Sequence, residues 1–211
     1  MSIPHKFYQT NFENGYATHS AILDITPYKP EVLILGTFNP DTPHANFADF
    51  FYGRNFLWPA FKNLFLQPNV TLQNRRMPQN GNPQAILNPT LPEIFEICLR
   101  LKLTFADLVL EVLHFNNPDY QLLQNDNVIF NEQEFNLIQD GQKENVGGLE
   151  QLNNLQQVNW NTQNIINFLC ENPQIKSIYF TRKPTGVWAE QWNQIVNHEC
   201  MKSRHLTNIF T

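Results

Sequence analysis

The sequence predicts an α/β fold with a mostly parallel central sheet, and three observations support this prediction. The run VLIL at 32–35 is apolar, contains β-branched residues and stops at Gly36, which is typical of a buried parallel strand. Apolar residues then recur at helical spacing. Strand-like and helix-like segments alternate as far as residue 210, and this order is typical of a sheet covered by helices.

Each further element is predicted from a local pattern. A helix is expected from Trp58, because apolar and aromatic residues recur at helical spacing as far as Phe65 and Pro59 is tolerated in a first turn. The remaining elements are a helix at 90–100 opened by the capping-box pattern Thr90-Leu91-Pro92-Glu93, a strand at 103–112 containing Asp107, a helix at 161–169 capped by Asn161 or Thr162, a strand at 175–180, a helix at 187–196 and a strand at 206–210.

A length of 211 residues corresponds to one main domain. We expect residues 1–30 to form an N-terminal arm or short helix, and residues 31–211 to form a single α/β domain. Stretches rich in Pro, Asn and Gln predict polar insertions near 67–89 and 114–146. The segment 37–54 is dense in Pro, Asp, His and aromatic residues, and a long loop after a strand is often functional.

Composition excludes several classes of protein. The net charge of −5 and the pI of about 5.6 argue against binding nucleic acid mainly by bulk electrostatics, although they allow a local basic groove. No apolar run is long enough for a membrane-spanning helix. The N-terminus also lacks the basic-then-apolar pattern of a secretory signal, so we expect a cytoplasmic protein with no membrane partner.

The three cysteines, Cys98, Cys170 and Cys200, lie far apart and form no CxxC motif. This spacing argues against a zinc knuckle or a four-cysteine iron–sulfur site. We therefore expect no metal, and we expect all three cysteines to be small buried side chains in a reducing compartment.

Ligands of open parallel sheets bind beyond the carboxyl ends of the strands. Three such ends carry polar side chains: residues 36–41, the surroundings of Asp107, and Thr181-Arg182-Lys183 at the expected start of a helix. Backbone N–H groups and the helix dipole attract anions, so the third end is a candidate phosphate site. The alternative is a solvated helix cap without a ligand.

Two of these motifs resemble a known family. VLILGTFNPD, followed by FYGRNFLWPAF, is similar to the first motif region of the uracil-DNA glycosylase superfamily, in particular to its mismatch-specific uracil/thymine and hypoxanthine branches. Residues 55–59 match the family's N-x-x-W-P, with Leu57 in place of the usual Phe. IYFTRKPTGVWAEQW also looks like the family's later strand–loop–helix. The resemblance implies a three-layer α/β/α sandwich with a mostly parallel central sheet.

The resemblance also implies a reaction. A damaged or mismatched base is flipped into a pocket and stacked on an aromatic ring, and its glycosidic bond is hydrolysed without a cofactor. Asn39 is then the candidate for orienting the water, because an amide is a weak general base. One extra residue separates Gly36 from Asn39, and Asp41 replaces the family's second glycine. Asp41 is therefore a second catalytic candidate, and an Asx turn before Pro40 is the alternative for Asn39.

The resemblance suggests further contacts with DNA, each with a structural alternative. The aromatic candidates could instead pack in the core, and Arg54 could instead pair with Asp49. Asp107 could instead cap the end of a strand. His44 is weighed as a surface residue rather than a catalyst. The base-binding candidates are Phe38, Phe51, Tyr52 and Asp107, and the phosphate-binding candidates are Arg54, Thr181, Arg182 and Lys183.

The resemblance is incomplete at one point. Family members carry another site loop after the last strand, whereas this sequence ends at HLTNIFT, about where that loop begins, so no residue is assigned to its role. Three hypotheses about function stay open. The first is a glycosylase, and the second is an inactive relative that binds a base, nucleotide or protein. The third is an unrelated hydrolase using Asp41 and His44, although no G-x-S-x-G motif is present.

Overall fold

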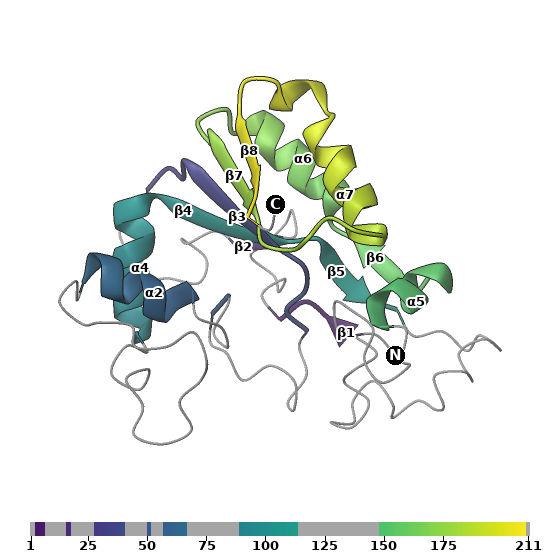
Figure 1. Cartoon of the computed structure of the whole chain (residues 1–211), viewed down its shortest axis with the longest axis horizontal. Coiled ribbons are helices and arrows are strands. Elements are labelled where there is room, and N and C mark those ends of the chain that lie inside the picture. Colours follow the sequence, from purple (N-terminus) through teal and green to yellow (C-terminus); the bar gives the residue numbers. More distant parts are fainter. Residues whose placement is uncertain are drawn as a thin grey trace, which may run out of the picture.

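The computed structural model of the chain contains helices and two β-sheets (Figure 1). It describes residues 3–6, 16–17, 28–40, 50–51, 57–66, 89–113 and 148–209. The two expected insertions, near 67–89 and 114–146, lie almost entirely outside these residues. No helix in these ranges is long and apolar enough to cross a membrane.

The larger sheet confirms the general α/β class. Its strand order is β2-β4-β3-β7-β8, in which β3, β4, β7 and β8 are parallel and only β2 runs antiparallel, at one edge. The apolar run at 32–35 is the core of its central strand. The strand bounds are β2 Tyr16–Ala17, β3 Val32–Gly36, β4 Leu103–Asp107, β7 Ser177–Phe180 and β8 His205–Asn208.

A second sheet corrects the expectation of one strand over 103–112. The chain leaves the parallel sheet after Asp107 and enters an antiparallel sheet at Val109, so a single residue, Leu108, separates two strands. Residues 3–4 supply an edge strand here, and most of the expected N-terminal arm or short helix, residues 1–30, lies outside the described residues. This sheet has the order β1-β5-β6, with bounds β1 Ile3–Pro4, β5 Val109–Val112 and β6 Val158–Trp160.

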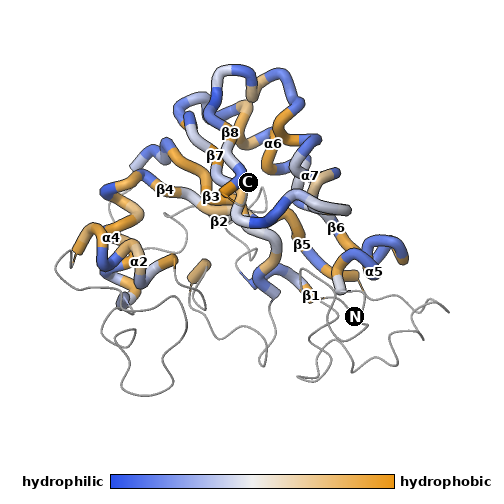
Figure 2. The backbone as a smooth tube through the Cα atoms, in the orientation of Figure 1, coloured by the Kyte–Doolittle hydropathy of each residue, from blue (hydrophilic) through white to orange (hydrophobic). Residues whose placement is uncertain are grey.

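Helices cover both faces of the larger sheet (Figure 1). Alternate side chains of β3 point to opposite faces. Leu33 and Leu35 join a cluster with α5, α6 and α7, whereas Ile34 joins a cluster with α2 and α4. Figure 2 shows the hydrophobic residues that run along β3. The helix bounds are α2 Leu57–Phe65, α4 Leu91–Leu101, α5 Gly148–Asn154, α6 Thr162–Glu171 and α7 Val187–Val196, and a short 3-10 turn, η4, covers Glu199–Met201.

The predicted capping box opens α4 and also ties it to α2. Glu93 Oε2 accepts a hydrogen bond from the backbone N–H of Thr90 at 2.8 Å and an ion-pair contact from Lys62 Nζ at 2.9 Å. Lys62 lies on α2 and is buried despite its charge. A single carboxylate therefore satisfies a helix end and a buried ammonium group. Desolvation raises the pKa of Glu93, but the bonds from Lys62 and Thr90 outweigh it and lower that pKa below its ordinary value of 4.5.

We expect Glu93 to stabilise the fold at neutral pH and to lose this effect in acid. The pKa of Glu93 is lower in the folded protein than in the unfolded chain. The stabilisation is therefore fully present when the pH lies above the unfolded pKa, and it is lost as the pH falls through the folded pKa. Thermal unfolding of wild type and Glu93→Gln from about pH 6 to about pH 2 should show a difference in Tm that shrinks as pH falls. Glu96→Gln, at an exposed position on the same helix, is the control. A difference that stays constant with pH would contradict the prediction.

Candidate functional site

A buried carboxylate lies at the carboxyl end of the larger sheet, where ligands of parallel sheets bind. Asp107 is the last residue of β4, and its partner in register is Gly36, the last residue of β3. Its exposed fraction is 1%. Burying an ionisable group is costly unless hydrogen bonds or charges compensate it. The partners of this carboxylate therefore show what the arrangement stabilises.

Asp107 binds two side chains from distant parts of the sequence. Its Oδ2 atom accepts a hydrogen bond from Asn39 Nδ2 at 2.5 Å and lies 2.8 Å from His5 Nε2. A carboxylate only accepts, so the amide presents its NH₂ group and the imidazole its Nε2–H to Asp107. We refer to His5, Asn39 and Asp107 as the Asp107 cluster. It fixes the orientation of one amide and one imidazole.

The backbone holds the loop that carries Asn39. The N–H of Val109 donates to the carbonyl oxygen of Thr37 at 2.9 Å, and the N–H of Lys6 donates to that of Asn39 at 2.7 Å. On the N-terminal side, the N–H of His5 donates to the carbonyl oxygen of Leu110 at 2.9 Å. Residues 37–39 are thus held between β5 and the residues that follow β1. Asn39 is half-buried, so part of this residue is accessible to solvent.

Two aromatic candidates lie against the cluster, but in different ways. Phe38 is half-buried, with its ring centroid 6.2 Å from that of His5. Phe51 is completely buried, and its ring stacks on Phe105 at 5.4 Å. The ring of His5 also lies close to it, with the two ring centroids 5.6 Å apart. Phe51 therefore supports the imidazole from within the core, whereas Phe38 is the ring with an accessible part.

The second carboxylate oxygen of Asp107 is orphaned. Oδ1 is buried, and no hydrogen-bond partner contacts it in the described part of the chain. An unsatisfied buried acceptor costs about 1–3 kcal/mol, so such atoms tend to occur where a ligand or water is bound. This atom lies on the same side chain that orients Asn39 and His5. It gives the Asp107 cluster one acceptor beyond those used to hold the cluster together.

The structure corrects the expected position of Thr181, Arg182 and Lys183 at the start of a helix. Helix α7 begins at Val187, four residues beyond Lys183, so the segment 181–183 does not form a helix N-terminus. Thr181 instead turns inward: its N–H and its hydroxyl donate to the carbonyl oxygen of Leu35 at 2.9 and 3.1 Å. Arg182 is half-buried and Lys183 is exposed. Lys183 is thus the better placed of the two cations to meet a phosphate.

An acidic side chain occupies the true start of α7. Gly186 precedes the helix with a φ of +52°, and a Cβ atom at this position would lie 2.8 Å from Glu150 Oε1. A carboxylate near a helix N-terminus is stabilised by the helix dipole. Glu150, from α5, thus stands where an anionic ligand would bind, which argues against a phosphate site here.

We expect Gly186→Ala to destabilise the protein by about 1–2 kcal/mol, because a side chain is strained at positive φ and would contact Glu150. Thermal or urea unfolding measures the loss. The double variant Gly186→Ala/Glu150→Ala should recover only the part due to contact, with Glu150→Ala alone as the reference. Full recovery in the double variant would show that backbone strain contributes nothing.

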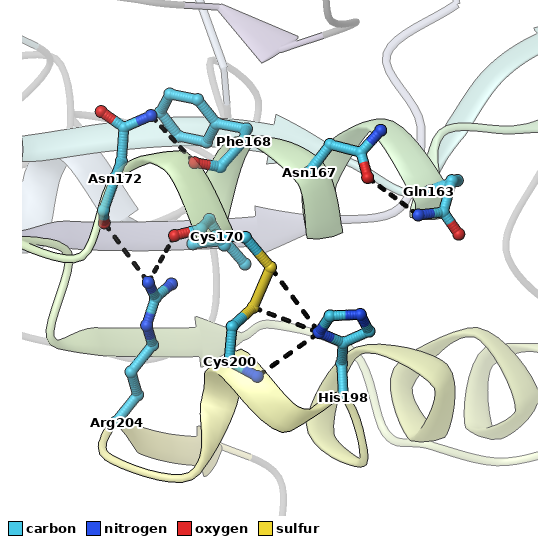
Figure 3. Close-up of a disulfide and its surroundings, with 9 residues drawn as sticks. Gln163, Asn167, Phe168, Cys170, Asn172, His198, Cys200 and Arg204 are labelled. Carbon is cyan, nitrogen blue, oxygen red and sulfur yellow. Dashed lines mark hydrogen bonds between the residues drawn. A yellow bond between two sulfur atoms is a disulfide. The ribbon is translucent and has the colours of Figure 1, made fainter.

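The cysteines depart from their expected roles. Cys98 is buried, as expected, and burial raises the pKa of its thiol to about 12. Cys170 and Cys200 are instead joined as a disulfide, and Cys170 is exposed, which corrects the expectation that all three cysteines are small buried side chains (Figure 3). Thirty positions separate them, and only the packing of α6 against η4 brings them together. No local pattern in the sequence announces this contact.

Several sequence candidates cannot be placed, and one residue was missed. Asp41, His44, Tyr52 and Arg54 lie outside the described residues. His5 was not predicted as a site residue, although it contacts Asp107 directly. His5 directly follows β1, which is two residues long and therefore too short for any alternation to show in the sequence.

No family model, no curated protein and no solved structure matches this chain.

Proposed function

We propose that the protein is a DNA glycosylase that hydrolyses the N-glycosidic bond of uracil or a related deaminated or mismatched base. One observation carries the proposal: a buried carboxylate orients the amide of Asn39 at the carboxyl end of the parallel sheet. This is the amide that the GTFNP motif singles out by its resemblance to the uracil-DNA glycosylase superfamily. The proposal includes a three-layer, glycosylase-like arrangement of the sheet and its helices.

In this mechanism Asn39 orients the attacking water. Asp107 engages Nδ2, so the carbonyl oxygen Oδ1 is the end of the amide that accepts a hydrogen bond from water. The water oxygen bonds to the anomeric carbon of the sugar, the glycosidic bond breaks, and the base leaves with the bonding electron pair. The proton that the water loses passes through solvent to the departing base anion. Asn39 increases the rate by orienting the water, because an amide is a poor proton acceptor.

The neighbouring groups have roles in base binding. Phe38 offers a partly accessible ring on which a flipped base can stack. His5, whose Nε2–H is engaged by Asp107, lies beside the ring of Phe38 and helps to shape the proposed base pocket. Asp41, Tyr52 and Arg54 keep the roles that the resemblance implies. Lys183 is exposed and is the proposed phosphate contact at the end of β7.

A second function is favoured by the charge of the chain. A net charge of −5 is unusual for a protein that must hold a polyanion, and Glu150 adds negative charge at the start of α7. The second proposal is therefore a non-enzymatic relative that binds a base, nucleotide or protein partner at the same strand ends. Binding to DNA at low salt separates the two functions.

A single-turnover excision assay tests the proposal. The full chain, in excess and at low salt, is incubated with labelled duplexes and single strands carrying uracil, hypoxanthine or a G·T mismatch, and alkali reveals abasic sites. Cleavage at one of these bases is expected for wild type. Asn39→Ala should lose it at least about 100-fold while still binding DNA. Absence of product on every substrate, together with absence of DNA binding, would overturn the glycosylase in favour of the binding protein.

A further inference from the structure

A second cluster of reactive side chains lies away from the Asp107 cluster, between the end of α6 and η4 (Figure 3). It contains Cys170, His198 and Cys200. The two cysteines form a disulfide whose Cα atoms are 5.6 Å apart. His198 Nδ1 lies 3.2 Å from the sulfur of Cys200 and 3.6 Å from that of Cys170. All three donor atoms lie within 4.8 Å of one another.

The imidazole places its Nδ1 atom beside the two sulfur atoms. His198 caps η4, and its Nδ1 atom accepts a hydrogen bond from the backbone N–H of Cys200 at 3.4 Å. An atom that accepts a hydrogen bond carries the lone pair, so in the neutral ring the proton is on Nε2. A neutral imidazole nitrogen beside two cysteine sulfur atoms is a donor set that Zn²⁺ prefers.

The spacing of the donors suits a tetrahedral ion. Zinc binds sulfur at about 2.3 Å and nitrogen at about 2.0 Å, so tetrahedral donors lie about 3.5–3.8 Å apart. Nδ1 of His198 is already at, or within a few tenths of an ångström of, this distance from both sulfurs. Only the two sulfurs are too close, because they are bonded to each other. Breaking that bond is the one change in connectivity that the site requires.

We propose that Cys170, His198 and Cys200 bind one Zn²⁺ when the disulfide is reduced, with water as the fourth ligand, and that reoxidation expels the ion. A dithiol reductant supplies two electrons and two protons, opens the disulfide and itself becomes a cyclic disulfide. Zinc then displaces the two thiol protons and binds both thiolates. The disulfide and the ion are alternative crosslinks between α6 and η4, so the redox state decides which one is present.

Both the dithiol reductant and the zinc ion can reach the site. Cys170 is exposed, and His198 and Cys200 are half-buried, so a small dithiol and a hydrated ion can reach them. Three protein ligands leave one position for water or an exchangeable ligand, as in zinc sites that are not purely structural. Cys98 lies in the core, where it is completely buried, and does not compete for the ion. The third cysteine is therefore an internal control.

Cobalt binding tests the proposal on the full chain. Protein reduced with dithiothreitol and desalted without oxygen is titrated with Co²⁺, whose thiolate charge-transfer and visible bands report tetrahedral sulfur coordination. We expect one Co²⁺ per reduced chain, displaced by Zn²⁺, and no bands with the oxidised chain. Zn²⁺ should also raise the Tm of the reduced protein and leave that of the oxidised protein unchanged.

Variants identify the ligands. His198→Gln should weaken Co²⁺ binding at least about tenfold, and Cys170→Ser or Cys200→Ser should remove most of the charge-transfer absorption. Cys98→Ala should bind as wild type does. Circular dichroism of each variant shows that it is folded. The proposal is wrong if the reduced wild-type chain gives no thiolate bands, or if His198→Gln binds the ion as tightly as wild type.

Discussion

Replacing Asp107 with alanine is expected to lower base excision by at least about 100-fold. The change removes the one oxygen atom that both Asn39 Nδ2 and His5 Nε2 contact, so both groups lose their fixed orientation. Misplacing a reacting group by about 1 Å costs rates of this order. Two half-buried or buried donors also lose an acceptor, which should lower the free energy of unfolding by about 2–4 kcal/mol.

The matched variants separate orientation from folding. Glu111→Ala removes an acid four residues further along the same chain segment, outside the Asp107 cluster, and should keep its activity. Asp107→Asn retains one accepting oxygen, so its excision rate should lie between those of wild type and Asp107→Ala. Single-turnover rates are measured well below the Tm of each variant. An Asp107→Ala protein that is folded and fully active would show that the cluster does not serve catalysis.

Replacing Trp58 with alanine is expected to destabilise the protein by about 3–5 kcal/mol, the usual cost of emptying a buried aromatic site. Trp58 is 2% exposed, and its ring packs on Phe50 at 5.7 Å and on Phe105 at 5.6 Å. Its indole N–H also donates to the carbonyl oxygen of Phe51 at 2.5 Å. Trp58 therefore joins α2 to the segment whose ring supports His5. Urea unfolding monitored by circular dichroism measures the loss.

The same helix offers a control for Trp58. Leu64 is 63% exposed, so Leu64→Ala should change the free energy of unfolding by no more than about 0.5 kcal/mol. Trp58→Phe keeps an aromatic ring but loses the hydrogen bond to Phe51, so its free energy of unfolding should fall by less than that of Trp58→Ala. A Trp58→Ala protein as stable as Leu64→Ala would refute the assignment of Trp58 to the core.

Elements encoded by local patterns could be predicted from the sequence. The strand at 32–36 follows from an apolar run that ends in glycine, and the helix at 91–101 follows from its capping box. Among the site residues, Asn39 and Asp107 were singled out because both lie near strand ends and because the resemblance to the glycosylase superfamily implies roles for them. The sequence could not reveal that they touch, since 68 positions separate them.

Features that depend on tertiary contacts could not be predicted. The strand containing Ile3 is too short for alternation to show, so the contact of His5 with Asp107 across 102 positions left no local trace. The switch between two sheets at Leu108 was missed because apolar residues continue through it. The disulfide was missed for the same physical reason: only the packing of α6 against η4 makes its two cysteines neighbours.

The position of His5 has a practical consequence for anyone who produces the protein. The first residues read as a disposable tail, and such tails are commonly trimmed or fused to affinity tags. Here the backbone of His5 and Lys6 bonds to Leu110 and Asn39, and the His5 side chain reaches the buried carboxylate. Trimming six residues would delete one member of the Asp107 cluster and free the loop that carries another. Purification tags belong at the opposite end of the chain.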